Sequence, residues 1–378
     1  MSPVSLSRRR LALVAAGLLV CLIIVLLSSR DESTVRASAL LDQLESAQWR
    51  DAGAPATVDD EDQEGEQAAA AAAAAWSPAA AAPCRRRIEV GVIFTKADQH
   101  PKMKTNLVRM LQTIAAHTPD CVNFNMFTDE NSKAIIGTAL LKARLSGRFT
   151  VTNHAIAPMA DQMKSLIEVM QEHFAPRKGT YYNDVLFFLT TTMHRSLPRL
   201  KRVIMMDVDI SVRADLALLD DHFERFSPEN VMGLSLELSP VYRHVLEAHR
   251  RETGNLTAGG APPAGFPGLN SGVVLLDLAR MRASRRYNQL MTEHEIRRRT
   301  ARYRFKGHLG DQDLYTLLAL DEPELFYVLP CGWNRQLCTF WRSVYADVFD
   351  QYFRCPGSIS IYHGNCKATI PTEGERRA

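Results

Sequence analysis

The sequence lacks a strong excess of charge of either sign. Its 378 residues carry 45 Lys and Arg against 42 Asp and Glu, a formal net charge of +3. So small a balance gives no reason to expect a nucleic-acid partner, which selects a strongly basic surface. With 46% hydrophobic and 23% charged residues, the composition is that of a folded globular protein, which excludes a disordered or fibrous chain.

The sequence also contains no Cys-x-x-Cys pair, which argues against a zinc ribbon. One of the seven cysteines, Cys21, lies in an apolar segment near the N-terminus. The other six form an even set, typical of a disulfide-bonded protein in an oxidising compartment. These are Cys84, Cys121, Cys331, Cys338, Cys355 and Cys366. The sequence leaves their pairing open, although local bridges are expected within residues 331–366.

Charge is absent from the segment Leu11 to Leu27, which follows Arg8, Arg9 and Arg10. As a helix the segment is about 26 Å long, and the two serines after it extend it to about 29 Å, close to the thickness of a bilayer core. It is longer than the apolar region of a cleaved signal peptide. The sequence therefore predicts a transmembrane signal anchor at 11–29 and a cytosolic tail at 1–10. A peptide removed near Ala37-Ser38-Ala39 is the alternative.

The charge is divided unevenly along the chain. Residues 1–84 hold 6 Lys and Arg against 11 Asp and Glu, so the remainder has a net charge of +8. Residues 30–83 combine an acidic run with alanine repeats, a composition that buries little surface. We interpret 30–83 as a low-complexity stem, with an acidic functional tail as the alternative. Basic residues before the anchor predict a single-pass type II protein with residues 84–378 in the lumen, where the sequon Asn255-Leu256-Thr257 could be glycosylated.

Short apolar runs alternate with helical periodicity from residue 86 onward. Strands are predicted at Ile88–Phe94, Val122–Phe127, Phe149–Ile156, Val203–Met206, Val231–Leu238, Gly272–Leu278 and Ile359–Tyr362. Helices are predicted at 102–116, 132–145, 160–174, 181–195 and 310–320. This order predicts one α/β domain over 84–378 with a mostly parallel sheet and helices on both faces. Such sheets bind ligands at the carboxyl ends of their strands.

Asp207-Val208-Asp209 directly follows the predicted strand Val203–Met206. Carboxylates at i and i+2 share a face of an extended chain, and two such oxygen ligands suit Mg²⁺ or Mn²⁺. One alternative is a turn with solvated acids. Another is the opening motif of haloacid-dehalogenase-type phosphatases, with Asp207 as nucleophile and Asp209 as general acid. Ser211 disagrees with the Thr or Val expected there in that family.

Two more segments could complete a ligand site. Asn270-Ser271-Gly272 opens an apolar run, where Asn and Ser offer hydrogen bonds to hydroxyls and Gly allows close approach. His363-Gly364 follows the last predicted strand. His363 could add a nitrogen ligand to a metal already held by two carboxylates. An ordinary turn and a structural histidine are the alternatives.

Four motifs occur in the order strand–Asp207-x-Asp209, Asn270-Ser271-Gly272, Gly310-Asp311-Gln312-Asp313 and His363-Gly364. Together they resemble the motifs of the glycogenin-like, retaining nucleotide-sugar transferases of family 8. The resemblance covers residues 86–370. It implies a GT-A fold, a Rossmann-like α/β architecture, in one catalytic domain behind the anchor.

The resemblance also implies residue roles. Asp207, Asp209 and His363 would hold Mn²⁺, with Mg²⁺ as the alternative ion. The contacts to the UDP-sugar would come from Thr95, Asp207, Val208, Asn270, Ser271, Gly272, Gly364 and Lys367. Asp311 and Gln312 are the candidate catalytic residues beside the sugar. Two departures stand out: no Pro-Trp follows Lys367, and the stretch about 16 residues before Asp207, where many members carry Arg or Lys, reads LTTTMHRS.

The implied activity is that of a retaining α-1,3-xylosyltransferase. It would move xylose from UDP-xylose to the xylose of xylosyl-glucose on EGF repeats of Notch-type glycoproteins, in the endoplasmic reticulum membrane or alternatively the Golgi. A glucoside xylosyltransferase, a glucosyltransferase and a non-catalytic sugar-binding scaffold are the alternatives. The basic stretch 280–306 is expected to be a solvated helix face or a contact for an acidic acceptor. Trp333 and Trp341 would either contact sugar or EGF module, or lie buried under disulfides.

Overall fold

A computed structural model describes residues 84–145, 147–175 and 185–372. The predicted tail, anchor and stem at 1–83 lie outside these residues, as does the first part of the helix predicted at 181–195. Within the described ranges, no helix is both long and apolar enough to cross a membrane.

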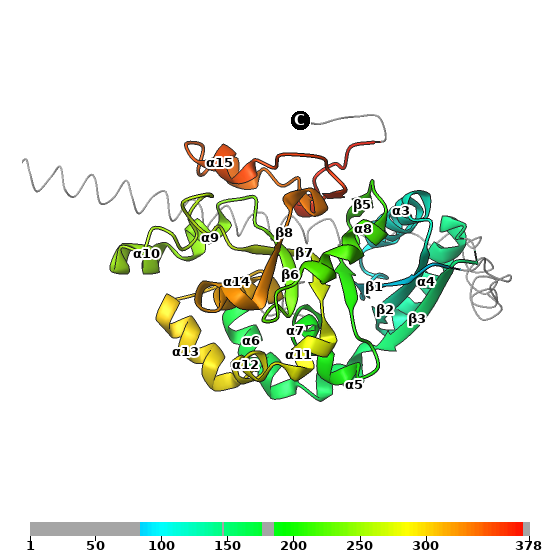
Figure 1. Ribbon diagram of the computed structural model, residues 1–378, viewed down its shortest axis with the longest axis horizontal. Helices are drawn as coiled ribbons and strands as arrows, with labels where there is room; N and C mark the ends of the chain where they lie inside the picture. The colour runs from blue at the N-terminus through cyan, green and yellow to red at the C-terminus, as the bar shows by residue number, and fades with distance from the viewer. Residues whose placement is uncertain (1–83, 146, 176–184, 373–378) are drawn as a thin grey trace, which may run out of the picture. The chain divides into compact units, whose positions relative to one another are not determined.

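In the part of the chain that the structure describes, ten strands form two sheets, the larger of which is seen in Figure 1. The strands are β1 (Arg87–Phe94), β2 (Cys121–Thr128), β3 (Phe149–Ala155), β4 (Val203–Met206), β5 (Ile210–Val212), β6 (Met232–Leu236), β7 (Leu269–Leu276), β8 (Phe326–Leu329), β9 (Arg335–Gln336) and β10 (Ile361–His363). The α-helices are α3 (Pro101–His117), α4 (Glu130–Ala143), α5 (Ile156–Asp161), α6 (Lys164–Phe174), α7 (Leu189–Ser196), α8 (Leu216–Asp220), α9 (Val241–Val245), α10 (Glu247–Thr253), α11 (Leu278–Ala283), α12 (Arg285–Leu290), α13 (Glu293–Tyr303), α14 (Asp311–Asp321) and α15 (Phe349–Phe353). Short 3-10 helices are η2 (Val185–Phe188), η3 (Asp221–Arg225), η4 (Pro323–Leu325), η5 (Cys331–Trp333), η6 (Phe340–Arg342) and η7 (Asn365–Lys367).

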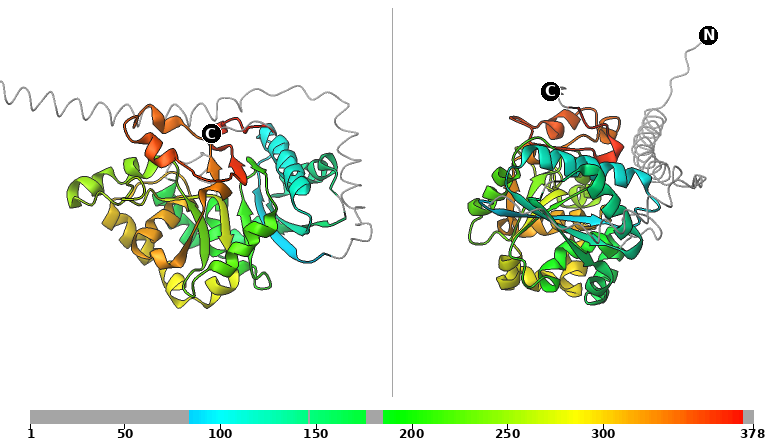
Figure 2. Two further views of the ribbon diagram at one scale, coloured as in Figure 1. Left: turned by 45° about the horizontal axis from the view of Figure 1, so that its top comes forward. Right: turned by 90° about the vertical axis from the view of Figure 1, so that its right-hand side faces the viewer.

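The large sheet has seven strands in the order β3-β2-β1-β4-β7-β6-β8. Strands β3, β2, β1 and β4 are mutually parallel, β6 is parallel to β8, and β7 runs antiparallel to both its neighbours. Helices lie on both faces of this sheet (Figure 2). The mostly parallel, helix-covered sheet predicted from the alternation of patterns is therefore confirmed.

The direction of the strands brings separate parts of the sequence to one edge of the sheet. Because β6 and β8 run in the same direction as β1 and β4, the carboxyl ends of these four strands point the same way. The antiparallel β7 contributes its first half to the same edge, where Val273 pairs with Met206. Thr95, Asp207 and Glu237 follow β1, β4 and β6 and thus share this edge with the start of β7.

The small sheet, in the order β5-β10-β9, joins the middle of the chain to its C-terminal part. Strand β10 pairs antiparallel with β5, with His363 opposite Ile210, and parallel with β9, with His363 opposite Gln336. This pairing places His363 beside the residue that follows Asp209 in the chain.

Local sequence explains where key helices begin. Asp129 caps α4, since its carboxylate accepts a hydrogen bond of 2.7 Å from the N–H of Ser132. Gly310 precedes α14 with a φ of 67°, a conformation that suits glycine, and a Cβ there would lie 2.9 Å from the Cβ of Phe187. The main core packs β1, β2, β4 and β7 against α3 and α8 through fully buried side chains such as Val90, Leu111 and Leu216.

Some predicted boundaries were wrong. Strand β7 begins at Leu269, so Asn270-Ser271-Gly272 lies inside the strand and not before it. A register shift between β6 and β7 at Leu234 and Ser235 accompanies this segment. The helix predicted at 160–174 is split into α5 and α6. The short strands β5, β8 and β9 were not predicted, because none of them is an apolar run bounded by charged residues, as β4 is.

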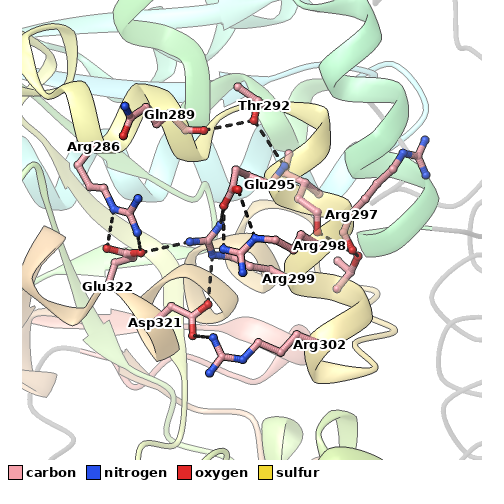
Figure 3. A network of polar contacts seen from close by, with 12 residues as sticks. Arg286, Gln289, Thr292, Glu295, Arg297, Arg298, Arg299, Arg302, Asp321 and Glu322 are labelled. Carbon is pink, nitrogen blue, oxygen red and sulfur yellow. Dashed lines mark hydrogen bonds and ion pairs between the residues drawn. The ribbon is translucent and has the colours of Figure 1, made fainter.

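The basic stretch 280–306 is largely paired within the protein (Figure 3). Arg299 in α13 is buried among Glu295, Asp321 and Glu322. Further pairs join Arg286 to Glu322, Arg297 to Glu172, Arg298 to Glu295, Arg302 to Asp321 and Arg304 to Glu252. These carboxylates neutralise most of the stretch, which weakens the idea that it binds an acidic acceptor.

Three disulfides connect the six cysteines that follow residue 83. They are Cys84–Cys121, Cys331–Cys355 and Cys338–Cys366. The second and third lie within residues 331–366, as predicted, and the third closes the chain segment that carries His363.

Candidate active site

Asp207, Asp209 and His363 form a cluster at the carboxyl end of β4. One ligand atom from each lies within 4.8 Å of the others. The Nε2 atom of His363 is 3.4 Å from Oδ2 of Asp207 and 3.4 Å from Oδ1 of Asp209. The His363 side chain is buried, whereas that of Asp207 is 53% exposed, so the cluster is reachable from solvent. Two carboxylates and one imidazole that converge in this way fit a divalent ion such as Mn²⁺.

The charges of the cluster control the protonation of His363. Burial favours its neutral form, but attraction to Asp209 and Asp207, with hydrogen bonds to both, outweighs burial and raises the pKa of His363 to about 10. Without a metal, an imidazolium therefore stands between the two carboxylates at neutral pH. A divalent cation has to displace that proton, because only the neutral ring nitrogen is a ligand.

Gly272 makes room for His363. A Cβ at residue 272 would lie 2.2 Å from Cε1 and 2.4 Å from Nδ1 of His363, a contact that would force the imidazole away. The carbonyl of Gly272 also accepts a hydrogen bond of 3.0 Å from the N–H of Asp207. The side of the cluster next to β7 is thus formed by backbone.

Asp311 lies at the start of α14, beside Ser271 of β7. Its carboxylate accepts hydrogen bonds from the hydroxyls of Ser271 (3.1 Å) and Thr190 (2.6 Å), and Tyr315 donates to Thr190 (2.9 Å). Burial raises the pKa of Asp311 to about 7 despite these hydrogen bonds. Thr190 belongs to the LTTTMHRS stretch, so a hydroxyl of that stretch contacts the acid.

Gln312 and Asn270 meet at a buried acid that the sequence reasoning missed. The side-chain oxygen of Gln312 accepts from the N–H of Ser271 (3.1 Å), and its amide nitrogen donates to Glu237 (3.3 Å). Asn270 also donates to Glu237 (2.9 Å), as does Ser239 (2.7 Å). Burial raises the pKa of Glu237. These contacts explain how Gln312 is held; the contact of Asn270 with a donor sugar stays a prediction.

Comparison with known proteins identifies the family of the chain. No family model matches the chain. It is 38% identical to human xyloside xylosyltransferase 1 over 291 residues, which cover 75% of this chain and 74% of that protein, and equally similar to the mouse protein. The chain belongs to the xyloside xylosyltransferase 1 family. It is therefore a glycosyltransferase, as the ordered motifs predicted.

A solved structure supports this relationship to xyloside xylosyltransferase 1. The crystal structure of mouse xyloside xylosyltransferase 1 in its apo form superposes with a TM-score of 0.72 at 37% identity, covering 76% of this chain and 100% of that one. Human xylosyl- and glucuronyltransferase LARGE1 is 27% identical over 69% of this chain, but over only 31% of its own length. The predicted GT-A-like fold is confirmed by the first of these matches.

In this chain, the remaining predicted site residues lie around the same edge of the large sheet, at the carboxyl ends of β1 and β4. Thr95 is buried at the end of β1. Val208 lies between the two metal-site acids and packs partly on the core. Gly364 donates its N–H to the carbonyl of Asp209 (2.8 Å), and Lys367 is exposed in η7 with a φ of 58°. Their contacts with a nucleotide stay predictions.

Besides Glu237, the sequence reasoning missed Thr190, Asn334 and Arg109. Glu237 directly follows β6, so the rule that found Asp207 could have found it. Arg109 on α3 lies close enough to Asp209 that its charge helps His363 to lower the pKa of that carboxyl against the effect of burial. Thr190 and Asn334 carry no local signal, because each is defined by a partner far along the chain.

The structure decides between the two interpretations of the tryptophans. Trp333 and Trp341 are both buried, at 8% and 4% exposure. Trp333 packs on the ring of His222, and Trp341 packs on His244 and Tyr345. Burial near the disulfides is therefore the correct interpretation for both.

Proposed function

We propose that the protein is a metal-dependent, retaining α-1,3-xylosyltransferase that moves xylose from UDP-xylose to the xylose of a xylosyl-glucose on EGF repeats. The main support is the cluster of Asp207, Asp209 and His363 beside Asp311 and Gln312, in a chain related to xyloside xylosyltransferase 1. When a divalent ion, Mn²⁺ or alternatively Mg²⁺, is bound by that cluster, it supplies positive charge to the diphosphate of UDP.

The protein residues themselves would bind and orient the substrates. Gly272 leaves room for the imidazole of His363 beside β7, and Arg109 with Lys367 would add positive charge near the phosphates. Asp311 and Gln312 are held rigidly by Ser271, Thr190 and Glu237, so they would position the sugar without rearranging.

Retention of configuration is best explained by reaction on one face of the sugar. The bond from the anomeric carbon to the UDP oxygen breaks, and the acceptor oxygen forms its bond on the same face while its proton passes to the departing phosphate. A double displacement would need an ionised nucleophile. Asp311, with a pKa of about 7 and two hydroxyl donors, and Glu237, with three donors, are poor candidates for that role.

The test is UDP release by the full-length chain with Mn²⁺ and a panel of UDP-sugars, with and without a xylosyl-glucose acceptor. Preference for UDP-xylose and transfer to that acceptor would support the proposal. Preference for UDP-glucose would favour a glucosyltransferase, and transfer to glucose a glucoside xylosyltransferase. The absence of UDP release from every donor, with or without acceptor, would favour a non-catalytic scaffold. The kinetics of Gln312→Ala and Asp311→Ala with UDP-xylose test the roles of these two residues. A trapped covalent xylosyl-enzyme would overturn the one-face mechanism.

We also propose that residues 11–29 anchor the protein in the endoplasmic reticulum membrane, or alternatively the Golgi, with residues 84–378 in the lumen. The three disulfides support an oxidising compartment. Protease protection of residues 84–378 in intact microsomes tests this topology, and digestion without detergent would contradict it.

A further inference from the structure

The second ring nitrogen of His363 contacts a buried amide. Nδ1 of His363 is 3.0 Å from Oδ1 of Asn334, a residue with no exposed surface. We propose that Asn334 is a positioning residue that keeps the proton of His363 on Nδ1, so that the Nε2 lone pair faces Asp207 and Asp209. This inference deepens the proposed function and rests on its divalent metal site.

The direction of the Asn334 amide is fixed by the backbone of β7. The N–H of Gly272 can only donate, and it donates to Oδ1 of Asn270 (3.0 Å). Oδ1 of Asn270 also accepts from Nδ2 of Asn334 (2.8 Å), so the oxygen of Asn334 must face His363. Reversing Asn334 would bring two oxygens together, and reversing Asn270 would bring its NH₂ group against the N–H of Gly272. One backbone donor therefore sets the tautomer of a side chain in another sheet.

Asn270 is itself held at its other end. Its amide nitrogen donates to Glu237, which also accepts from Gln312 (3.3 Å) and Ser239 (2.7 Å). The chain of hydrogen bonds therefore runs from His363 through Asn334, Asn270 and Glu237 to Gln312. It joins the predicted metal ligand to the predicted catalytic residue through buried, satisfied groups, which are the kind that hold a ligand rigidly.

The surroundings leave His363 and Asn334 little freedom to find another arrangement. The backbone of His363 pairs with β5 and β9, and its ring packs against Gly272. Asn334 lies between η5 and β9, and its N–H donates to the carbonyl of Cys331 (3.0 Å), a disulfide-bonded residue. Asn334 is therefore a fixed hydrogen-bond partner for Nδ1 of His363.

The experiment titrates the purified full-length chain with Mn²⁺ alone and measures free Mn²⁺ by electron paramagnetic resonance. We expect Asn334→Ala to raise the Kd for Mn²⁺ about 10- to 100-fold, the usual effect of removing the partner of a metal-binding histidine. Activity of this variant should return toward the wild-type value as Mn²⁺ is raised, which a general loss of structure would not allow. Asn334→Asp loses the hydrogen bond to Oδ1 of Asn270 but keeps an oxygen acceptor for Nδ1, and it should therefore bind Mn²⁺ more tightly than Asn334→Ala.

Asn230→Ala is the matched control. Asn230 is also buried and accepts from the N–H of Ser227 (2.8 Å) while donating to the carbonyl of Glu324 (2.8 Å), away from the metal cluster. It should lower the melting temperature but leave the Kd for Mn²⁺ unchanged. Unchanged Mn²⁺ affinity in Asn334→Ala, or equal losses in Asn334→Ala and Asn334→Asp, would overturn the inference. Failure of the wild-type chain to bind Mn²⁺ would instead refute the metal site of the proposed function, and the inference with it.

Discussion

The missing side chain at residue 272 allows the imidazole of His363 to reach two carboxylates. We expect Gly272→Ala to abolish tight Mn²⁺ binding and to reduce kcat/KM by at least about 100-fold, because the added Cβ would lie 2.2 Å from Cε1 of His363. Gly233→Ala in the neighbouring β6 is a suitable control, since its Cβ would meet Phe226 at 3.2 Å and touch no metal ligand. Equal Mn²⁺ affinities for the two variants would show that His363 can move without loss.

The protonation of Asp311 makes the stability of the folded protein depend on pH. Its carboxyl is protonated in the folded protein up to about pH 7 but ionises near pH 4 in the unfolded chain. The folded state therefore binds more protons in this window, and its stability falls as pH rises from about 4 to 7. A shift of about three pKa units corresponds to roughly 4 kcal/mol.

Asp311→Asn removes this titration. The melting temperature of the variant relative to wild type should rise between pH 5 and pH 7 and then level off. Asp350→Asn, at an exposed acid paired with Arg342, should show no such trend. A difference between Asp311→Asn and wild type that does not depend on pH would contradict the elevated pKa of Asp311.

At the level of elements, α13 combines a buried and an exposed ion pair on one helix. Arg299 is 1% exposed and lies 3.3 Å from Asp321 and 3.2 Å from Glu322, whereas Arg297 and Glu172 are both about half exposed. Arg299→Ala should lower the free energy of unfolding by up to about 3–5 kcal/mol, because Asp321 and Glu322 then keep only the more exposed Arg302 and Arg286 as partners. Arg297→Ala should cost less than about 1 kcal/mol. Urea unfolding of both variants measures the difference, and similar values would contradict it.

Most strands and helices of the α/β pattern could be predicted from the sequence. The strand Val203–Met206 was correct at both ends, because four apolar residues bounded by charged ones leave little choice. The position of Asn270-Ser271-Gly272 was not, since only a register shift between β6 and β7 tells the strand from the turn before it. Elements that are long and periodic are encoded locally, whereas short strands depend on their pairing partners.

In the candidate site, too, features encoded by the local sequence could be predicted, whereas those that depend on distant residues could not. Asp207 and Asp209 could be found because they follow a recognisable strand, and His363 because it directly follows the predicted strand Ile359–Tyr362, although the strand β10 includes it. Thr190 and Asn334 could not, because their neighbours Asp311 and His363 lie far away in the sequence. The antiparallel direction of β7, which brings residue 272 to the carboxyl end of β4, is likewise a property of the whole sheet and not of any segment.

At the level of the whole molecule, metal binding should stabilise the fold, because its ligands come from both sheets and only the folded state holds them together. The proton on His363, whose pKa is raised to about 10, competes with the metal over the whole range from pH 6 to pH 8. The Mn²⁺ affinity should therefore increase about tenfold per pH unit, which adds about 1.4 kcal/mol of stabilisation per unit at saturating metal.

Melting temperatures with and without Mn²⁺ at pH 6, 7 and 8 test this linkage. The increment due to Mn²⁺ should grow with pH in the wild-type chain and be lost in His363→Ala. An increment that is constant from pH 6 to pH 8 would mean that His363 is already neutral before the metal binds.

The pairing of β5 with β10 also sets an order of events during synthesis. Asp209 and His363 are separated by about 150 residues, which a ribosome adds in about 10–30 s at typical elongation rates. During that interval the strands β1 to β4 can already assemble, while β5 waits for the strand that pairs with it. The two carboxylates thus leave the ribosome long before the imidazole does. Only after β10 has docked, and Cys338 has joined Cys366 behind it, does the nascent chain possess all three groups that a metal ion requires.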